Sequence, residues 1–126
     1  MIAYVDTHIA VRLANAEIQL LTEQALDAMA ANSLRISPMV VLELEYLFEL
    51  GRISISADDV VRKLEYELDL RICDLDFQKI MDVACHEKWT RDPFDRIIVA
   101  HAKANGLSPL ISADQIIRQN YPRATW

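Results

Sequence analysis

A chain of 126 residues is long enough for one domain with its own hydrophobic core and too short for two domains of ordinary size. Hydrophobic residues make up 52% of it, there are only 2 glycines and 4 prolines, and no low-complexity tract occurs, which argues against disorder. The formal net charge of −6 argues against a broad basic surface for nucleic acid. It leaves two interpretations open: acids that keep the protein soluble, or acids gathered in one place to hold cations. We expect a single domain over residues 1–126.

No part of the sequence predicts membrane insertion or export. The segment Met1–Asp6 has no basic region, and no apolar run reaches the roughly 18 residues of a membrane span. We therefore expect a cytoplasmic protein without a membrane partner. Cys73 and Cys85 lack the close spacing of a zinc or redox motif, so we expect two reduced, mostly buried thiols. The three histidines show no metal-binding spacing and are expected to be structural or surface residues: His8, His86 and His101.

The first strand is predicted at Ile2–Val5, an apolar run that ends directly in Asp6-Thr7. Asp6 is therefore expected at the carboxyl end of a buried parallel strand. The residues that follow, through Ala16, favour a helix, which Asp6 or Thr7 would cap; this structural role is the alternative to a functional one. The next elements are a helix at Thr22–Ala31 and a second strand at Leu34–Ser37.

A third helix is predicted from Pro38 to Leu50, with Gly51 as its stop. Its three glutamates do not point the same way. On a helical wheel Glu45 and Glu49 lie opposite the apolar stripe, whereas Glu43 faces inward with Val40. Glu43 is thus either a functional carboxylate or an edge residue that reaches back to water.

The middle of the chain continues the alternation of helices and strands. An amphipathic helix at Ala57–Leu68 precedes a third strand at Leu70–Cys73. Asp74 or Asp76 then caps a helix that includes residues 80–84. These acids have ordinary roles at helix starts, so none of them is a candidate for chemistry.

The helix that begins at Pro93 carries the most unusual carboxylate. Asp92 suits the N-cap position, Pro93 suits the first helical position, and Asn105-Gly106 ends the helix. Asp95 shares the apolar side of this helix with Ile98, Val99 and Ala102. A carboxylate placed there needs a proton, a cation or a metal beside it.

The pattern of Asp6 returns near the end of the chain. A strand within Leu107–Ser112 is followed at once by Asp114, which precedes a helix at Gln115–Gln119 and an edge strand at Ala124–Trp126. Helix capping is again the alternative role for Asp114. The alternation as a whole predicts an α/β fold in three layers, α/β/α, with a central, mostly parallel sheet of four to five strands and right-handed crossovers.

In such folds ligands bind beyond the carboxyl ends of the strands, where Asp6 and Asp114 are expected. If Glu43 and Asp95 border the same crevice, they complete a cluster of four carboxylates. A divalent cation resolves the repulsion among such groups, and an all-oxygen site suits Mg²⁺ or Mn²⁺. Such ions activate water and neutralise charge on a phosphate, which predicts a phosphodiesterase.

The chain resembles PIN-domain ribonucleases, and specifically the VapC toxins of bacterial toxin–antitoxin systems, over nearly its whole length. The resemblance rests on four motifs: Tyr4-Val5-Asp6-Thr7; Ser37-Pro38 leading to Glu43-Leu44; Arg91-Asp92-Pro93-Phe94-Asp95-Arg96 with Ala100 and Ala102; and Leu110-Ile111-Ser112-Ala113-Asp114. It implies a PIN-like fold and a metal-dependent endoribonuclease in which Mg²⁺ or Mn²⁺ is held by Asp6, Glu43, Asp95 and Asp114.

The resemblance also implies supporting residues and partners. Thr7 and Ser112 match hydroxyl residues that flank the site, and Asp92 is either a helix cap or a further acid that joins the metal through water. RNA phosphates are candidate partners of Arg12, Arg91 and Arg96, with surface ion pairing as the alternative. A VapB-type antitoxin and a homodimer are the expected protein partners. The competing hypothesis is a catalytically silent α/β interaction module whose acids only cap helices.

Overall fold

The computed structural model describes all residues from Met1 to Trp126. Its elements, in chain order, are β1 (Ile2–Val5), α1 (Thr7–Ala14), the 3₁₀ helix η1 (Ile18–Leu20), α2 (Glu23–Ala31), β2 (Ser33–Ile36), α3 (Pro38–Glu49), α4 (Ala57–Leu68), β3 (Arg71–Ile72), α5 (Phe77–Ala84), α6 (Pro93–Ala104), β4 (Leu110–Ile111), α7 (Gln115–Asn120) and β5 (Ala124–Thr125). Every predicted strand and helix is present, and only η1 was not predicted.

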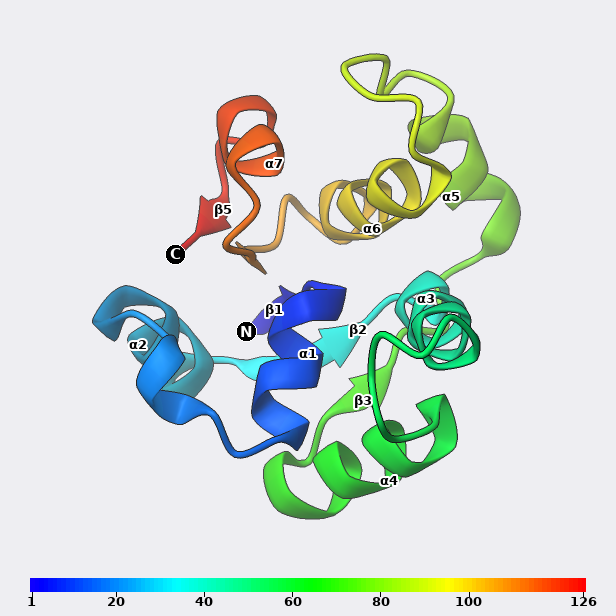
Figure 1. Cartoon of the computed structure of the whole chain (residues 1–126). Helices are drawn as coiled ribbons and strands as arrows, with labels where there is room; N and C mark the ends of the chain where they lie inside the picture. The colour runs from blue at the N-terminus through cyan, green and yellow to red at the C-terminus, as the bar shows by residue number, and fades with distance from the viewer.

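The central sheet has five strands in the order β3-β2-β1-β4-β5, and all neighbours are parallel. The prediction of a mostly parallel sheet is thus confirmed, and even the last strand runs with the others. Figure 1 shows α1, α2 and α4 on one side of the strands and α5, α6 and α7 on the other, with α3 beside the β2 and β3 end. The helix α3 contacts α1, α4 and α6 and so joins the two outer layers. The predicted three-layer α/β/α fold is confirmed.

The helices begin where side chains cap them. Asp6, Thr22, Ser37, Ser56, Asp76, Asp92 and Asp114 each accept a backbone hydrogen bond at the start of the helix that follows. Asp76, and not Asp74, is the cap of α5. Three of the acids that the sequence singles out therefore also have the structural role that was their alternative.

The core fills the space between the sheet and its helices. One cluster of 26 buried residues includes Tyr4, Ile36, Leu44 and Ile98, and a smaller one of Ile80, Ala84 and Ala100 joins α5 to α6. No buried side-chain nitrogen or oxygen lacks a hydrogen-bond partner. No helix is both long and apolar enough to cross a bilayer.

The two cysteines differ, and one prediction was wrong. Cys73 is buried and its Sγ accepts a hydrogen bond of 3.0 Å from the Tyr4 hydroxyl, whereas Cys85 is exposed. The reason is that α5 ends at Ala84, so that Cys85 is the C-cap on the outside of the molecule. Both thiols are free, as expected.

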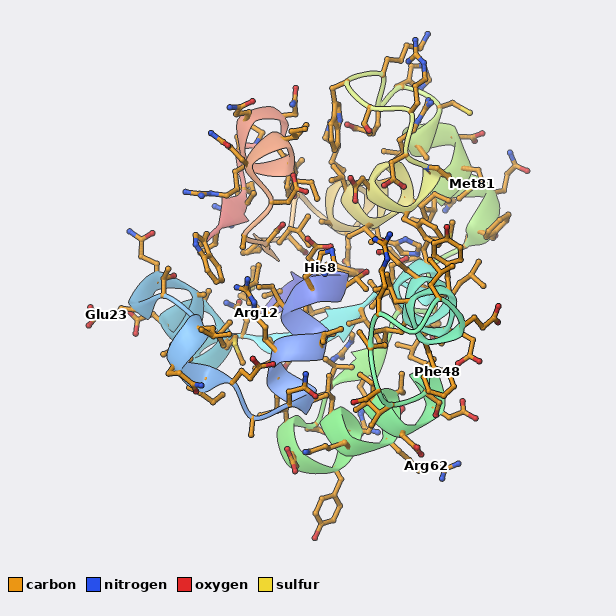
Figure 2. The ribbon with its side chains drawn as sticks, viewed as in Figure 1. His8, Arg12, Glu23, Phe48, Arg62 and Met81 are labelled. Carbon is orange, nitrogen blue, oxygen red and sulfur yellow. The ribbon has the colours of Figure 1, made fainter.

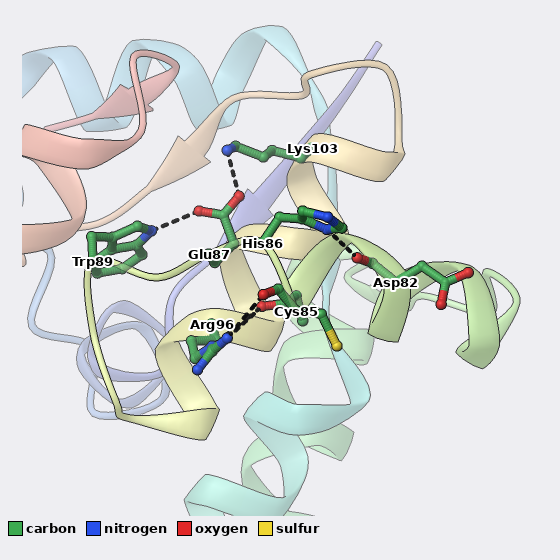
Figure 3. A network of polar contacts seen from close by, with 8 residues as sticks. Asp82, Cys85, His86, Glu87, Trp89, Arg96 and Lys103 are labelled. Carbon is green, nitrogen blue, oxygen red and sulfur yellow. Dashed lines mark hydrogen bonds and ion pairs between the residues drawn. The ribbon is translucent and has the colours of Figure 1, made fainter.

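The loop between α5 and α6 is held by a buried carboxylate (Figure 3). Glu87 is only 3% exposed; it forms an ion pair with the Lys103 ammonium of α6 and accepts a hydrogen bond of 2.6 Å from Trp89 Nε1. On the other side of the loop, the Arg96 guanidinium donates to the carbonyl oxygens of Ala84 and Cys85. Side chains of α6 thus fix the loop that leads to Asp92 and Asp95 at the start of this helix.

Lys103→Met is expected to lower the free energy of unfolding by about 3 kcal/mol, because it leaves a buried carboxylate without its cation. The matched control is Arg71→Met, which breaks the exposed Arg71–Asp69 pair and should change stability by less than about 0.5 kcal/mol. Urea denaturation at pH 7 measures both. Equal changes in the two variants would show that the buried pair stabilises the fold no more than a surface pair does.

Candidate metal-binding site

The site is built at the carboxyl edge of the sheet, where β1 and β4 lie side by side. The chain moves from β1 through β2 to β3, and then returns to the other side of β1 to form β4. The strand order therefore reverses between β1 and β4, which is where ligands bind in open parallel sheets. Asp6 follows β1 and its backbone N–H donates to Ile111 O at 3.0 Å, so that Asp6 lies in register beside Ser112.

Asp6 is a buried carboxylate with two hydrogen-bond donors. It is 4% exposed, accepts 2.8 Å from the Thr7 N–H, and accepts 2.7 Å from the Ser112 hydroxyl. Burial raises its pKa, while the hydrogen bonds from Ser112 and Thr7 lower it, and the nearby Asp114 raises it further. The balance is a raised pKa, so the charged form of Asp6 is disfavoured without a cation.

Glu43 joins Asp6 through Thr7. The Thr7 hydroxyl, which is fully buried, donates to Glu43 Oε1 at 2.5 Å. Glu43 itself is half-buried, as its inward position on α3 predicted. Burial is the main cause of its raised pKa, and the charges of Asp6 and Asp92 add to it. Thr7 thus fixes a carboxylate of α3 against the start of α1.

Asp95 shows that the acids converge. It lies half-buried in the first turn of α6, and its pKa is raised from 3.8 to about 7. The causes, in order of size, are burial and then the charges of four other acids: Asp92, Asp6, Asp114 and Glu43. No hydrogen bond and no cation offsets these contributions. Carboxylates from α3, α6 and the ends of β1 and β4 therefore lie close enough to repel one another.

Asp114 and Asp92 cap helices next to this cluster. Asp114 Oδ1 accepts 2.8 and 2.9 Å from the N–H groups of Ile116 and Ile117, and Asp92 Oδ1 accepts 2.9 Å from Phe94 N–H. The Ser112 hydroxyl links the two strand ends, because it donates to Asp6 and accepts from the Asp114 N–H at 3.1 Å. A capping aspartate still has its second oxygen free for another ligand.

The donor set fits a hard divalent cation. All the candidate ligands are carboxylate oxygens, with hydroxyl groups of Thr7 and Ser112 behind them, which is the chemistry that Mg²⁺ or Mn²⁺ prefers. In this structure, however, no three Asp, Glu, His or Cys side chains are arranged to share one metal ion. Carboxylates approach one another closely only with a cation or a shared proton between them.

The three arginines that are candidates for RNA contacts have different surroundings. Arg96 is occupied by the end of α5, as described above, and Arg91 is exposed in a hollow that also contains Cys85. Arg12 lies on α1 with its guanidinium 5.3 Å from the ring centre of Trp126. The structure therefore separates the three arginines, and only Arg12 lies on α1, the helix that begins at Asp6.

The sequence analysis missed one residue of the site. His8 is exposed in the first turn of α1, and its positive charge lowers the pKa of both Asp6 and Glu43. Its position two residues after Asp6 was the available signal, but the search for metal-binding histidine spacing set it aside. His101, in contrast, is the structural residue expected: it is buried, bonded to Ser37, and burial lowers its pKa.

Comparisons with known proteins agree with this architecture. The family model of the PIN domain matches residues 3–121. Among solved structures, a chain in the crystal structure of VapBC2 from Rickettsia felis, bound to a DNA fragment from their promoter, superimposes with a TM-score of 0.60 at 18% identity. The match covers 95% of this chain and 93% of that one. A search of curated proteins finds no match. With a match over most of its length and the acids placed at the β1–β4 edge, the chain belongs to the PIN-domain family.

Proposed function

We propose that the protein is a metal-dependent endoribonuclease that hydrolyses RNA phosphodiester bonds as the toxin of a toxin–antitoxin pair. The observation that carries this proposal is the Asp95 carboxylate, half-buried among four other acids with no cation beside it. PIN domains are generally nucleases, and family membership therefore supports a hydrolase. A strongly raised pKa at the carboxyl ends of the strands is the signature expected of a functional site.

Mg²⁺ or Mn²⁺ is the cofactor that the donor set favours, held by Asp6, Glu43, Asp95 and Asp114. When bound, such an ion neutralises charge on a phosphate and lowers the pKa of water. The protein supplies the positions of the ligands. Ser112 and the Thr7 N–H orient Asp6, and the Thr7 hydroxyl orients Glu43.

The ionisation of Asp95 then controls whether the site can work. Its pKa of about 7 means that, in the ion-free protein, the group is about half protonated at neutral pH. The Asp95 carboxyl would lose its proton when a divalent cation is held there, because the cation favours the charged form. Metal binding is therefore expected to release a proton and to strengthen as the pH rises.

The partners proposed are RNA, a VapB-type antitoxin and a second copy of this chain. The VapBC2 structure that resembles this fold is a support for the antitoxin. A further support is the exposed apolar surface of α3, where Leu42 is 57% and Tyr46 49% exposed. Tyr46 stacks on Phe94 at a ring-centre distance of 5.8 Å, so that this surface reaches the start of α6. Apolar surface next to an acidic cluster suits a protein partner that covers the site.

The second candidate is an interaction module without catalysis, and one observation favours it. Asp6, Asp92 and Asp114 all cap helices, which explains three of the acids without any chemistry. It does not explain Asp95, which caps nothing and accepts no hydrogen bond. Asp95 is therefore the residue that separates the two hypotheses.

Asp6→Asn and Asp95→Asn are each expected to lower the rate of RNA cleavage in Mn²⁺ by more than the roughly 10- to 100-fold typical of losing an outer-shell partner. Asparagine caps a helix as well as aspartate, so the fold should survive. The matched control is Asp58→Asn, in the exposed first turn of α4, which should leave cleavage unchanged. Gel analysis of a labelled RNA measures all three. Full activity in both site variants would leave the interaction module as the better hypothesis.

The stability of the ion-free protein should reveal the same group through its pH dependence. The folded pKa of Asp95 lies above its ordinary value, so the folded state binds the proton more tightly than the unfolded state does. The stabilisation is complete below about pH 4 and is lost as the pH rises through about 7. At pH 8 the free energy of unfolding of Asp95→Asn should therefore exceed that of the wild type by about 1 kcal/mol, after allowance for solvent screening, and Asp95→Asn should melt at the higher temperature. Mn²⁺ should stabilise the wild type alone.

Thermal unfolding at pH 5 and pH 8, with EDTA and with Mn²⁺, tests this expectation. Asp58→Asn serves again as the control for the loss of one negative charge. The difference in stability between Asp95→Asn and the wild type is compared at the two pH values. If the variant's advantage is no larger at pH 8 than at pH 5, Asp95 is not under repulsion.

A further inference from the structure

Trp126 lies in the same row as the acids across the edge of the sheet. In the parallel register Val5 is beside Ile111 and Ile111 is beside Thr125, and Ser112 N–H donates to Thr125 O at 3.1 Å. The next residues of the three strands are Asp6, Ser112 and Trp126. Since neighbouring strands lie about 4.8 Å apart, the backbone of Trp126 is about two strand spacings from that of Asp6.

The indole of Trp126 is backed by a cation. The Arg12 guanidinium of α1 lies over the ring at 5.3 Å from its centre, within the range of a cation–π contact. Arg12 forms no ion pair with a carboxylate, because the only ion pairs of the molecule are Arg71–Asp69 and Lys103–Glu87. Trp126 is partly exposed, while its buried part packs against the core. A partly exposed aromatic residue beside an uncompensated cation suits a ligand that has both a flat base and a negative charge.

Acidic residues are unevenly distributed along the chain, and few of them lie near Trp126 in the sequence. Residues 43–95 carry 14 acids and 7 Lys or Arg residues, whereas residues 105–126 carry a single acid, Asp114, and two arginines. One of these, Arg118, lines a hollow of α7 together with Ala124 of β5. A polyanion at the acidic edge therefore meets less repulsion over β5 and α7 than over α3, α4 and α5.

We propose that Trp126, backed by Arg12, is a stacking platform for a base of single-stranded RNA whose scissile phosphate lies at the acidic edge. The proposal rests on the proposed nuclease function. It names the form of the substrate and the surface, β5 and α7, along which the strand leaves the acidic edge. Single-stranded nucleic acids are bound in this manner, by aromatic rings that stack on bases and by cations that contact the backbone. A duplex should not bind there, since its bases are stacked on one another and closed to the ring.

Fluorescence of Trp126 tests the contact directly. The chain has 2 tryptophans, and the difference between the fluorescence of the wild type and that of Trp126→Phe isolates Trp126 while the Trp89–Glu87 hydrogen bond stays in place. In EDTA, where the RNA stays intact, we expect a short oligouridylate to quench this fluorescence in a saturable manner. The duplex of the same oligouridylate with oligoadenylate should not. Trp126→Leu in the otherwise wild-type chain should weaken binding of the oligouridylate, measured by fluorescence polarisation of a labelled strand, by about tenfold.

Arg12→Met should weaken the same binding by about fivefold, because it removes both the charge and the support of the ring. The matched control is Arg62→Met, which removes the same charge from the exposed face of α4. Figure 2 shows Arg62 away from α1, on which Arg12 and His8 lie, and it should leave the affinity unchanged. If Arg12→Met is unfolded by circular dichroism, Arg12→Lys replaces it, since it keeps the charge without the planar group and should give a smaller loss.

Binding without a change in Trp126 fluorescence, equal quenching by the duplex, equal losses in Arg12→Met and Arg62→Met, or no binding at all would each overturn the platform. Addition of Mn²⁺ to the same samples separates this proposal from the nuclease itself. Quenching without cleavage would reject the nuclease and keep the base contact. Cleavage without quenching would keep the nuclease and reject the contact.

Discussion

Repulsion among carboxylates at one edge of the sheet is the constraint on which the rest of the structure depends. Asp95 has no hydrogen bond and no cation, and burial together with the charges of four other acids raises its pKa. A protein that needed only helix caps would not place a fifth acid inside such a cluster, because an unpaired, half-buried charge destabilises the fold. The stability lost at this edge is offset by the core and by the anchoring of the loop before α6 through Glu87.

The parallel sheet makes this convergence unavoidable. Strands that all run the same way end at the same edge, so residues that follow β1 and β4 become neighbours although they are more than 100 positions apart. Ser112 makes use of this by bonding to Asp6 and to the Asp114 backbone at once. The helices α3 and α6 then need only begin near that edge to bring Glu43 and Asp95 to it. The site is a consequence of the topology, and the local sequence decides only which side chains occupy it.

Most of the fold could be predicted because its signals are local. Caps, apolar runs and glycine stops place every helix and strand to within a few residues, and Glu43 and Asp95 are half-buried as their helical positions indicated. What depends on distant contacts could not be predicted. The exposure of Cys85 follows from where α5 ends against α6, and the contact of Arg12 with Trp126 joins residues from opposite ends of the chain. The metal, the nuclease activity and the roles of the four acids remain predictions.

The distribution of charge suggests how one small domain can serve two kinds of partner. The segment from α3 to α5 combines most of the acids with exposed apolar groups such as Leu42 and Tyr46, which disfavours RNA and suits a protein. The side formed by β5 and α7 has a single acid, and its Arg118 lines a hollow together with Ala124 of β5. The acidic edge follows β1 and β4, and β4 is the neighbour of β5 in the sheet. A protein partner on α3 that extends over Phe94 would then reach the acids without competing for the surface of β5 and α7 on which the proposed RNA strand would lie. Inhibition would then act on the reacting phosphate more than on the rest of the strand.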